Sequence, residues 1–144
     1  MSAEQTLNSL LVNLFRDIKE IEERKLITDE FSDITYNDMH VIEAIGLDGE
    51  KRMSRLSELL NVTLASITTA VDALCDKGYA VRERSSKDKR VVFVKLTERG
   101  KRAYDHHKKF HDDMIKTIIG QLDSEECEVL TRSMQRLMEF FNED

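Results

Sequence analysis

The chain has 144 residues, of which 40% are hydrophobic and 35% charged, and its formal net charge at pH 7 is −6. This composition fits one ordinary globular domain that can bury a core alone, although long helices need a partner to cover them. No run of about 18 apolar residues occurs, so we expect neither a membrane span nor a membrane partner. The N-terminus lacks a secretory leader, and the two cysteines show neither metal-pair nor disulfide spacing, which together indicate a cytoplasmic protein.

A long amphipathic helix is predicted over residues 4–27. Its apolar side chains recur at helical spacing along one face: Leu7, Leu10, Leu11, Leu14, Ile18 and Ile21. Polar residues fill the opposite face, and little of the neighbouring chain is free to cover the apolar stripe. Such a stripe is typical of a helix shared with a second subunit.

A helix-turn-helix is predicted next. Thr35 is expected to cap a helix over residues 36–47, and a shorter helix over about 54–60 follows the turn at 48–50. Asn61 is expected to end the shorter helix, which buries three leucines: Leu56, Leu59 and Leu60. A helix, a tight turn and a second helix in this order form the DNA-binding motif of that name.

The helix that begins after Thr63 is the predicted recognition helix, and Gly78 is a good stop for it. Three apolar residues at helical spacing mark its buried side: Ile67, Val71 and Leu74. The first turns otherwise carry only small or hydroxylated side chains, which let a helix enter a DNA major groove N-terminus first. The alternative is a solvent face that is rich in Ser and Thr by chance.

Two strands, over residues 81–85 and 91–96, are predicted to form a hairpin joined by the polar turn 86–89. From Arg82 to Arg102 the chain has nine basic and three acidic residues, a net charge of +6 that leaves −12 for the rest. A basic island in an acidic protein is the electrostatic pattern expected for nucleic-acid binding. The alternative is an ordinary solvated charge run.

Thr97 is expected to cap a long helix that ends near Ile119 or Gly120, and a last helix begins near Ser124. The last helix has its own apolar stripe: Val129, Leu130, Met134, Leu137, Met138 and Phe141. The expected fold is therefore mainly α with a small β-hairpin wing.

The candidate DNA-binding residues come from the helix-turn-helix and the hairpin. Ser54 and Arg55 are placed to reach a phosphate, as the first helix of such a motif often does. The full set is Ser54, Arg55, Thr63, Ala65, Ser66, Thr68, Thr69, Arg82, Arg84, Lys87, Asp88, Lys89 and Arg90.

The hairpin resembles the wing of the MarR family of transcription regulators. The resemblance rests on Asp88-Lys89-Arg90, Val92, Val94, Leu96-Thr97 and Gly100, with Lys89 where the family often has Arg. It implies one winged helix-turn-helix domain over residues 1–144, with 35–97 as the DNA-binding part and 1–34 and 98–144 as dimerisation helices. It also implies an intertwined homodimer on double-stranded, pseudo-palindromic operator DNA, with Arg90 in the flanking minor groove and Asp88 bracing Arg90 or the turn.

Within the family, the chain resembles the FabT-like repressors of fatty-acid-synthesis genes, at Ile34, Asp38-Met39-His40 to Gly46, Val62-Thr63-Leu64, Thr68-Thr69, Lys77-Gly78-Tyr79 and His107 to His111. This resemblance implies acylated acyl carrier protein as co-repressor. The family usually places an effector pocket between the dimerisation helices and the winged helix. The candidate pocket residues are Leu14, Ile18, Ile21, Phe31, Met39, Ile42 and Phe110, which as apolar residues are equally well explained as core.

The histidines leave a second regulatory possibility open. His107 and His111 stand four residues apart on one helix, a spacing that can hold a metal, and His40 lies on a helix that packs near this one in MarR proteins. Zinc-sensing members use histidines from the same two helices. The alternative, which we prefer, is that the three histidines pack and hydrogen-bond at the junction of the two parts, with no metal and no cofactor.

No catalytic signature is present: the chain has no G-x-S-x-G, no phosphate-binding glycine loop and no supported Cys–His arrangement. We therefore expect a protein that is not an enzyme. A winged-helix module that binds protein rather than DNA is the rival from another class.

Overall fold

The computed structural model describes residues 1–28 and 30–142, and the chain forms two compact units, Met1–Lys108 and Lys109–Asp144. The first unit contains α1 (Ala3–Leu26), α2 (Tyr36–Ile45), β1 (Lys51–Arg52), α3 (Met53–Leu60), α4 (Leu64–Asp76), β2 (Ala80–Arg84) and β3 (Val92–Leu96). Helix α5 (Glu98–Gly120) begins in the first unit and ends in the second, which also contains α6 (Ser124–Asn142). The prediction of a mainly helical chain with a small β wing is confirmed.

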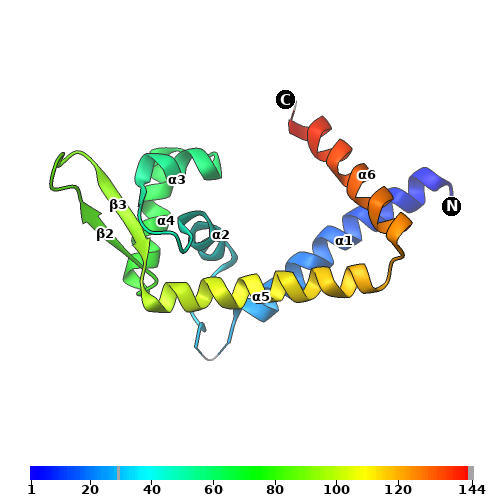
Figure 1. Ribbon diagram of the computed structural model, residues 1–144, viewed down its shortest axis with the longest axis horizontal. Helices are drawn as coiled ribbons and strands as arrows, with labels where there is room; N and C mark the ends of the chain where they lie inside the picture. Colours follow the sequence, from blue (N-terminus) through cyan, green and yellow to red (C-terminus); the bar gives the residue numbers. More distant parts are fainter. Residues whose placement is uncertain (29, 143–144) are drawn as a thin grey trace. The chain divides into compact units, whose positions relative to one another are not determined.

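Helices α2, α3 and α4 pack together beside the small sheet and form the helix-turn-helix (Figure 1). Helices α3 and α4 meet at 108°, within the range usual for this motif. The core between them contains side chains that are at most 1% exposed: Met39, Ile42, Ile45, Leu56, Ile67, Val71 and Leu74. The prediction that Leu59 is buried was wrong, since Leu59 is 45% exposed. Leu56 and Leu60 share one face of α3, and Leu59 lies on the neighbouring face.

The predicted helix caps are confirmed, and they explain where the helices begin. The Thr35 hydroxyl accepts a hydrogen bond from the Asp38 N–H, and the Thr63 hydroxyl accepts one from the Ser66 N–H. At the end of α2, Gly46 has φ of +71°, a conformation that favours glycine. Helix α2 therefore stops at Ile45, two residues before the predicted end.

The sheet has three antiparallel strands in the order β1-β3-β2, whereas the sequence predicted only the β2–β3 hairpin. In the hairpin, Ala80 pairs with Leu96 and Arg84 with Val92. The missed strand β1 pairs Lys51 with Val94. It is only two residues long, so it has no alternation that a sequence pattern could reveal.

The start of α5 is fixed against the corner between α4 and β2. The Thr97 N–H donates to the Tyr79 carbonyl at 3.1 Å, and the Thr97 hydroxyl donates to the Gly78 carbonyl at 2.6 Å. A Cβ atom at Gly100 would lie only 2.0 Å from the Tyr79 carbonyl oxygen. Residue 100 must therefore be glycine for this close approach, which gives a physical reason for the Gly100 of the wing signature.

Apolar side chains of the terminal helices are exposed in the single chain. On α1, Leu7, Leu10 and Leu14 are 58%, 60% and 53% exposed. Helix α6 buries none of its described residues, so the whole predicted stripe is exposed: Val129, Leu130, Met134, Leu137, Met138 and Phe141.

Among the described residues, no single helix is long and apolar enough to cross a membrane. Helices α3 and α4, which are bent at 108° to each other, are long and apolar enough only when they are taken together. Core helices of other proteins reach the same length and composition.

Candidate nucleic-acid interface

The N-terminal half of α4 is a solvent-exposed face of small side chains. Ala65, Ser66, Thr68 and Thr69 are all exposed, while Ile67 between them is buried against α2 and α3. The Thr68 hydroxyl donates to the Leu64 carbonyl at 2.8 Å, and the Thr69 hydroxyl donates to the Ala65 carbonyl at 3.2 Å. The face is therefore low in relief and carries no charge over its first two turns.

Arg90 stands at the wing turn and is held by Asp88. The Arg90 Nε donates to Asp88 Oδ1 and the Arg90 Nη2 donates to Asp88 Oδ2, both at 3.1 Å. Asp88 also accepts from the Arg90 backbone N–H at 3.0 Å, so one carboxylate fixes both the turn and the side chain. The Arg90 guanidinium holds the pKa of Asp88 below its usual value. The Arg90 side chain is nevertheless 90% exposed, so it stays accessible to a ligand.

A second ion pair joins the wing to α4. Arg82 on β2 pairs with Asp72 on α4. This contact links the two elements that line the surface, and it occupies the one acidic side chain near the middle of α4. The sequence gave no sign of this contact, because it joins a helix to a strand.

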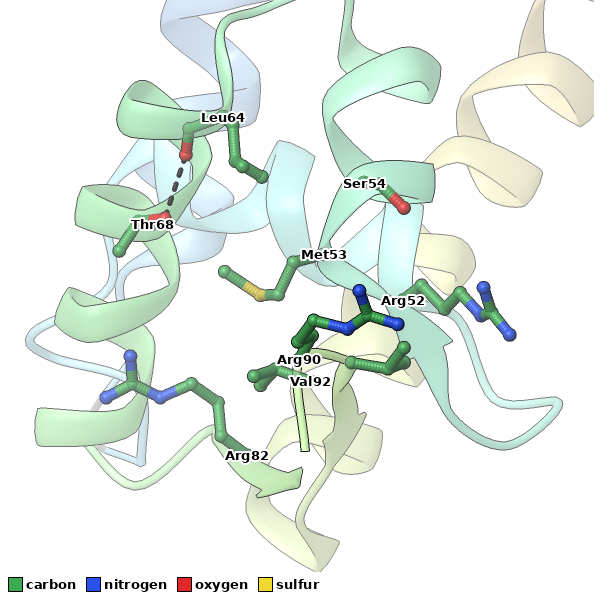
Figure 2. Close-up of a pocket in the computed structure, with 9 residues that line it drawn as sticks. Arg52, Met53, Ser54, Leu64, Thr68, Arg82, Arg90 and Val92 are labelled. Atoms are coloured by element: carbon green, nitrogen blue, oxygen red, sulfur yellow. Dashed lines mark hydrogen bonds between the residues drawn. The ribbon is translucent and has the colours of Figure 1, made fainter. Parts of the chain in front are cut away.

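A cleft of about 310 Å³ lies between the N-termini of α3 and α4 and the wing. Figure 2 shows the side chains of Arg52, Arg82 and Arg90 around it. The other lining residues are Met53, Ser54, Leu64, Thr68, Val91 and Val92. Its charged lining residues are three arginines, and two of them, Arg82 and Arg90, are paired with Asp72 and Asp88. Of these arginines, Arg52 was missed by the sequence analysis, because it belongs to the unrecognised strand β1.

All thirteen residues predicted to bind DNA lie on the surface of the first unit. Twelve are exposed and Asp88 is half-buried. Arg55 pairs with Glu58 at 3.2 Å on the exposed side of α3. Within the described residues, no ion pair holds Arg84, Lys87 or Lys89 of the wing, so these cations are available to solvent or to a partner.

The three histidines differ in how exposed they are. His107 on α5 is 4% exposed; its Nε2 lies 3.2 Å from Glu22 Oε1 and also contacts the Glu43 carboxylate. Burial, followed by the charges of Glu22 and Glu43, raises the pKa of the neighbouring Tyr36. His40 is exposed, with its Nδ1 at 4.0 Å from Glu43 Oε2. His107 thus joins α1, α2 and α5 through carboxylates, whereas His111 belongs to the second unit.

The candidate effector residues fall into different surroundings. Phe31, Met39 and Ile42 are at most 3% exposed in the core, while Leu14 and Ile21 lie on the exposed side of α1. Ile18 is half-buried on α1, and Phe110 belongs to the second unit.

Comparisons with known proteins agree with this geometry. A family model described as "Transcriptional regulator SarA/Rot" matches residues 24–107. The chain is 36% identical to Streptococcus pneumoniae FabT, which was solved in complex with DNA; the match covers 97% of this chain and 98% of that one, with a TM-score of 0.91. The chain belongs to the winged-helix transcription regulators of the MarR/SarA type.

Two further matches are more distant. The Bacillus subtilis regulator YpoP is 26% identical over 103 residues, which are 72% of this chain and 67% of YpoP. RV1404 of Mycobacterium tuberculosis has the same fold at 19% identity and a TM-score of 0.76, over 96% of this chain and 94% of that one. Further curated matches from Bacillus subtilis are also named as transcriptional regulators.

Proposed function

We propose that the chain is a repressor that binds a pseudo-palindromic operator as a homodimer. The observation that carries the proposal is the surface formed by the uncharged face of α4 and the arginine-lined cleft beside the wing. The N-terminus of α4 would enter a major groove, and the free wing cations would neutralise phosphates. The 36% identity to a FabT solved with DNA supports this function.

In this mechanism Asp88 is a positioning residue for Arg90. The two hydrogen bonds at 3.1 Å fix the guanidinium before DNA arrives, so less side-chain entropy is lost on binding. Arg90 would then enter the minor groove beside the recognised major groove, where narrow A·T-rich DNA concentrates negative potential. The cluster of wing arginines and lysines supplies the sequence-independent part of the affinity.

Arg90→Ala is expected to weaken operator binding by about 10- to 100-fold, as the loss of one well-placed arginine contact does. Because the Arg90 side chain is 90% exposed, the fold should be unaffected. Fluorescence anisotropy with labelled operator measures the affinity, and circular dichroism checks the fold. Arg16→Ala is the matched control, since Arg16 is also exposed and lies 3.5 Å from a neighbouring aspartate on α1.

The salt dependence of the same titration separates DNA binding from a protein-binding winged helix. Counterion release predicts a steep fall in affinity as salt rises, with a shallower slope for Arg90→Ala. Wild-type affinity in a folded Arg90→Ala dimer would remove the wing tip from the mechanism.

We further propose control of fatty-acid-synthesis genes, with acylated acyl carrier protein as co-repressor. A buried acyl chain gains about 0.8 kcal/mol per methylene. That gain tightens DNA binding only if the acyl chain binds the DNA-competent dimer better than it binds other conformations of the protein. Basic residues away from the wing are candidates to dock the acidic carrier: Arg24, Lys25, Arg102, Lys108 and Lys109.

A zinc-responsive regulator is the second candidate. The contacts of His107 with Glu22 and Glu43 favour it, because imidazole and carboxylate are ligand types that zinc takes. The same contacts also suit a junction that holds α1, α2 and α5 together without metal. The exposure of His40 on α2 favours this metal-free junction.

One mobility-shift series distinguishes the two effectors. We expect the long-chain acylated carrier to raise operator affinity, and the unloaded carrier and physiological free zinc to leave it unchanged. Equal shifts with loaded and unloaded carrier would contradict the co-repressor. Operator binding that requires zinc, together with zinc found by metal analysis, would favour the second candidate.

A further inference from the structure

The hydroxyl protons of the recognition helix are already used within the helix. Thr68 donates to the Leu64 carbonyl at 2.8 Å, the bond dashed in Figure 2, and Thr69 donates to the Ala65 carbonyl at 3.2 Å. A carbonyl oxygen has no proton, so each hydroxyl must be the donor. A hydroxyl has only one proton to give. Thr68 and Thr69 therefore offer a partner an acceptor oxygen and a methyl group, but no donor.

The rest of α4 reinforces this restriction. Helix α4 contains no Arg, Lys, Asn or Gln, the side chains that pair with the edges of guanine or adenine through two hydrogen bonds. Its Asp72 is held by Arg82, so the carboxylate is not directed to a cytosine amino group. The Thr63 hydroxyl donates to the Ser66 oxygen at 2.9 Å, so Ser66 keeps its own proton and is the hydroxyl of this face that can still donate. At Thr68 and Thr69 the exposed face thus offers methyl groups and acceptors.

We propose that Thr68 and Thr69 are specificity-determining residues that select thymine through its C5-methyl group, with their oxygens tolerating a neighbouring adenine amino group. In the major groove only thymine presents a methyl group, and adenine presents an amino donor. Guanine presents two acceptors there, which Thr68 and Thr69 cannot satisfy because their hydroxyl protons are already donated. The inference rests on the proposed operator binding and names the bases that the same helix reads.

The test uses an operator half-site obtained by selection from random DNA with the full-length dimer. Each thymine in the α4 contact region is then replaced by deoxyuridine, which lacks only the methyl group. Loss of one buried methyl should lower wild-type affinity by about fourfold at the contacted thymine. Thr68→Ser and Thr69→Ser keep the hydroxyl and remove the side-chain methyl, so they should bind thymine DNA about fourfold more weakly and lose the sensitivity to deoxyuridine.

Two further variants distinguish the loss of the methyl contact from a general effect of changing these threonines. Thr68→Val and Thr69→Val keep a methyl in place and should keep the sensitivity to deoxyuridine. Thr117→Ser is the matched control, because Thr117 is exposed on α5 and its hydroxyl donates to the Asp113 carbonyl at 2.9 Å in the same manner. It should leave both the affinity and the deoxyuridine effect unchanged.

Failure of this inference is distinguishable from failure of the proposed function. Sequence-specific binding that changes less than twofold at every deoxyuridine position would overturn the thymine selection alone. Selection of guanine at the positions facing Thr68 and Thr69 would also overturn it. If no sequence-specific DNA binding occurs at all, the proposed function itself fails, and the inference fails with it.

Discussion

Gly100→Ala is expected to lower the free energy of unfolding by about 3 kcal/mol or more, or to prevent folding, because overpacking against rigid atoms is costly. The new Cβ would lie 2.0 Å from the Tyr79 carbonyl oxygen and 3.1 Å from the Tyr79 carbonyl carbon. Both are backbone atoms, so no flexible side chain can move aside. Urea unfolding followed by circular dichroism measures the change.

Gly120→Ala provides the matched control, because nothing lies within 4 Å of a Cβ built at Gly120. Alanine is the better helix former by up to about 1 kcal/mol, so this change should be neutral or slightly stabilising. A Gly100→Ala protein with wild-type stability would mean that α5 does not start against the Tyr79 carbonyl. The bonds of Thr97 to Gly78 and Tyr79 would then not fix this junction.

The winged helix was predictable from local patterns because each of its elements carries its own signal. The Thr63 cap, the spacing of Ile67 and Val71, and the basic turn around Asp88 are each contained in a few consecutive residues. The two-residue strand β1 carries no such signal, and its pairing with β3 depends on tertiary contact. Arg52 was therefore missed even though it lines the cleft.

The polar contacts were harder to predict than the elements. The sequence indicated that Asp88 braces Arg90, a contact between residues two apart, and the geometry agrees. It could not indicate that Asp72 pairs with Arg82, because the two residues meet only once β2 has packed beside α4. It showed that the face of α4 is rich in hydroxyl groups, but not that the helix backbone accepts the protons of Thr68 and Thr69. Only the folded helix shows that the oxygen of each threonine hydroxyl, and not its proton, is available to a partner.

The terminal helices carry the prediction with the largest expected effect on function. Leu10 and Leu14 are 60% and 53% exposed on α1, and α6 buries none of its described residues. Large apolar stripes of this kind usually mark a protein interface. We therefore expect the wild-type chain to sediment as a dimer at micromolar concentration and to remain one on dilution to nanomolar levels. The double variant Leu10→Glu/Leu14→Glu should sediment as a monomer, because it places two charges in the proposed dimer interface.

Loss of the dimer should also reduce operator affinity by at least about 100-fold, because two linked half-site contacts become two independent ones. The winged helix should stay folded, since neither leucine belongs to its core. Ser9→Glu/Asn13→Glu is the matched control: both residues are exposed on α1, have the same spacing of four, and lie off the apolar stripe. If the leucine variant remained a dimer with wild-type affinity, the exposed stripe of α1 would not be the subunit contact. A monomeric variant with unchanged affinity would instead show that one recognition helix suffices, and would rule out the two-fold operator.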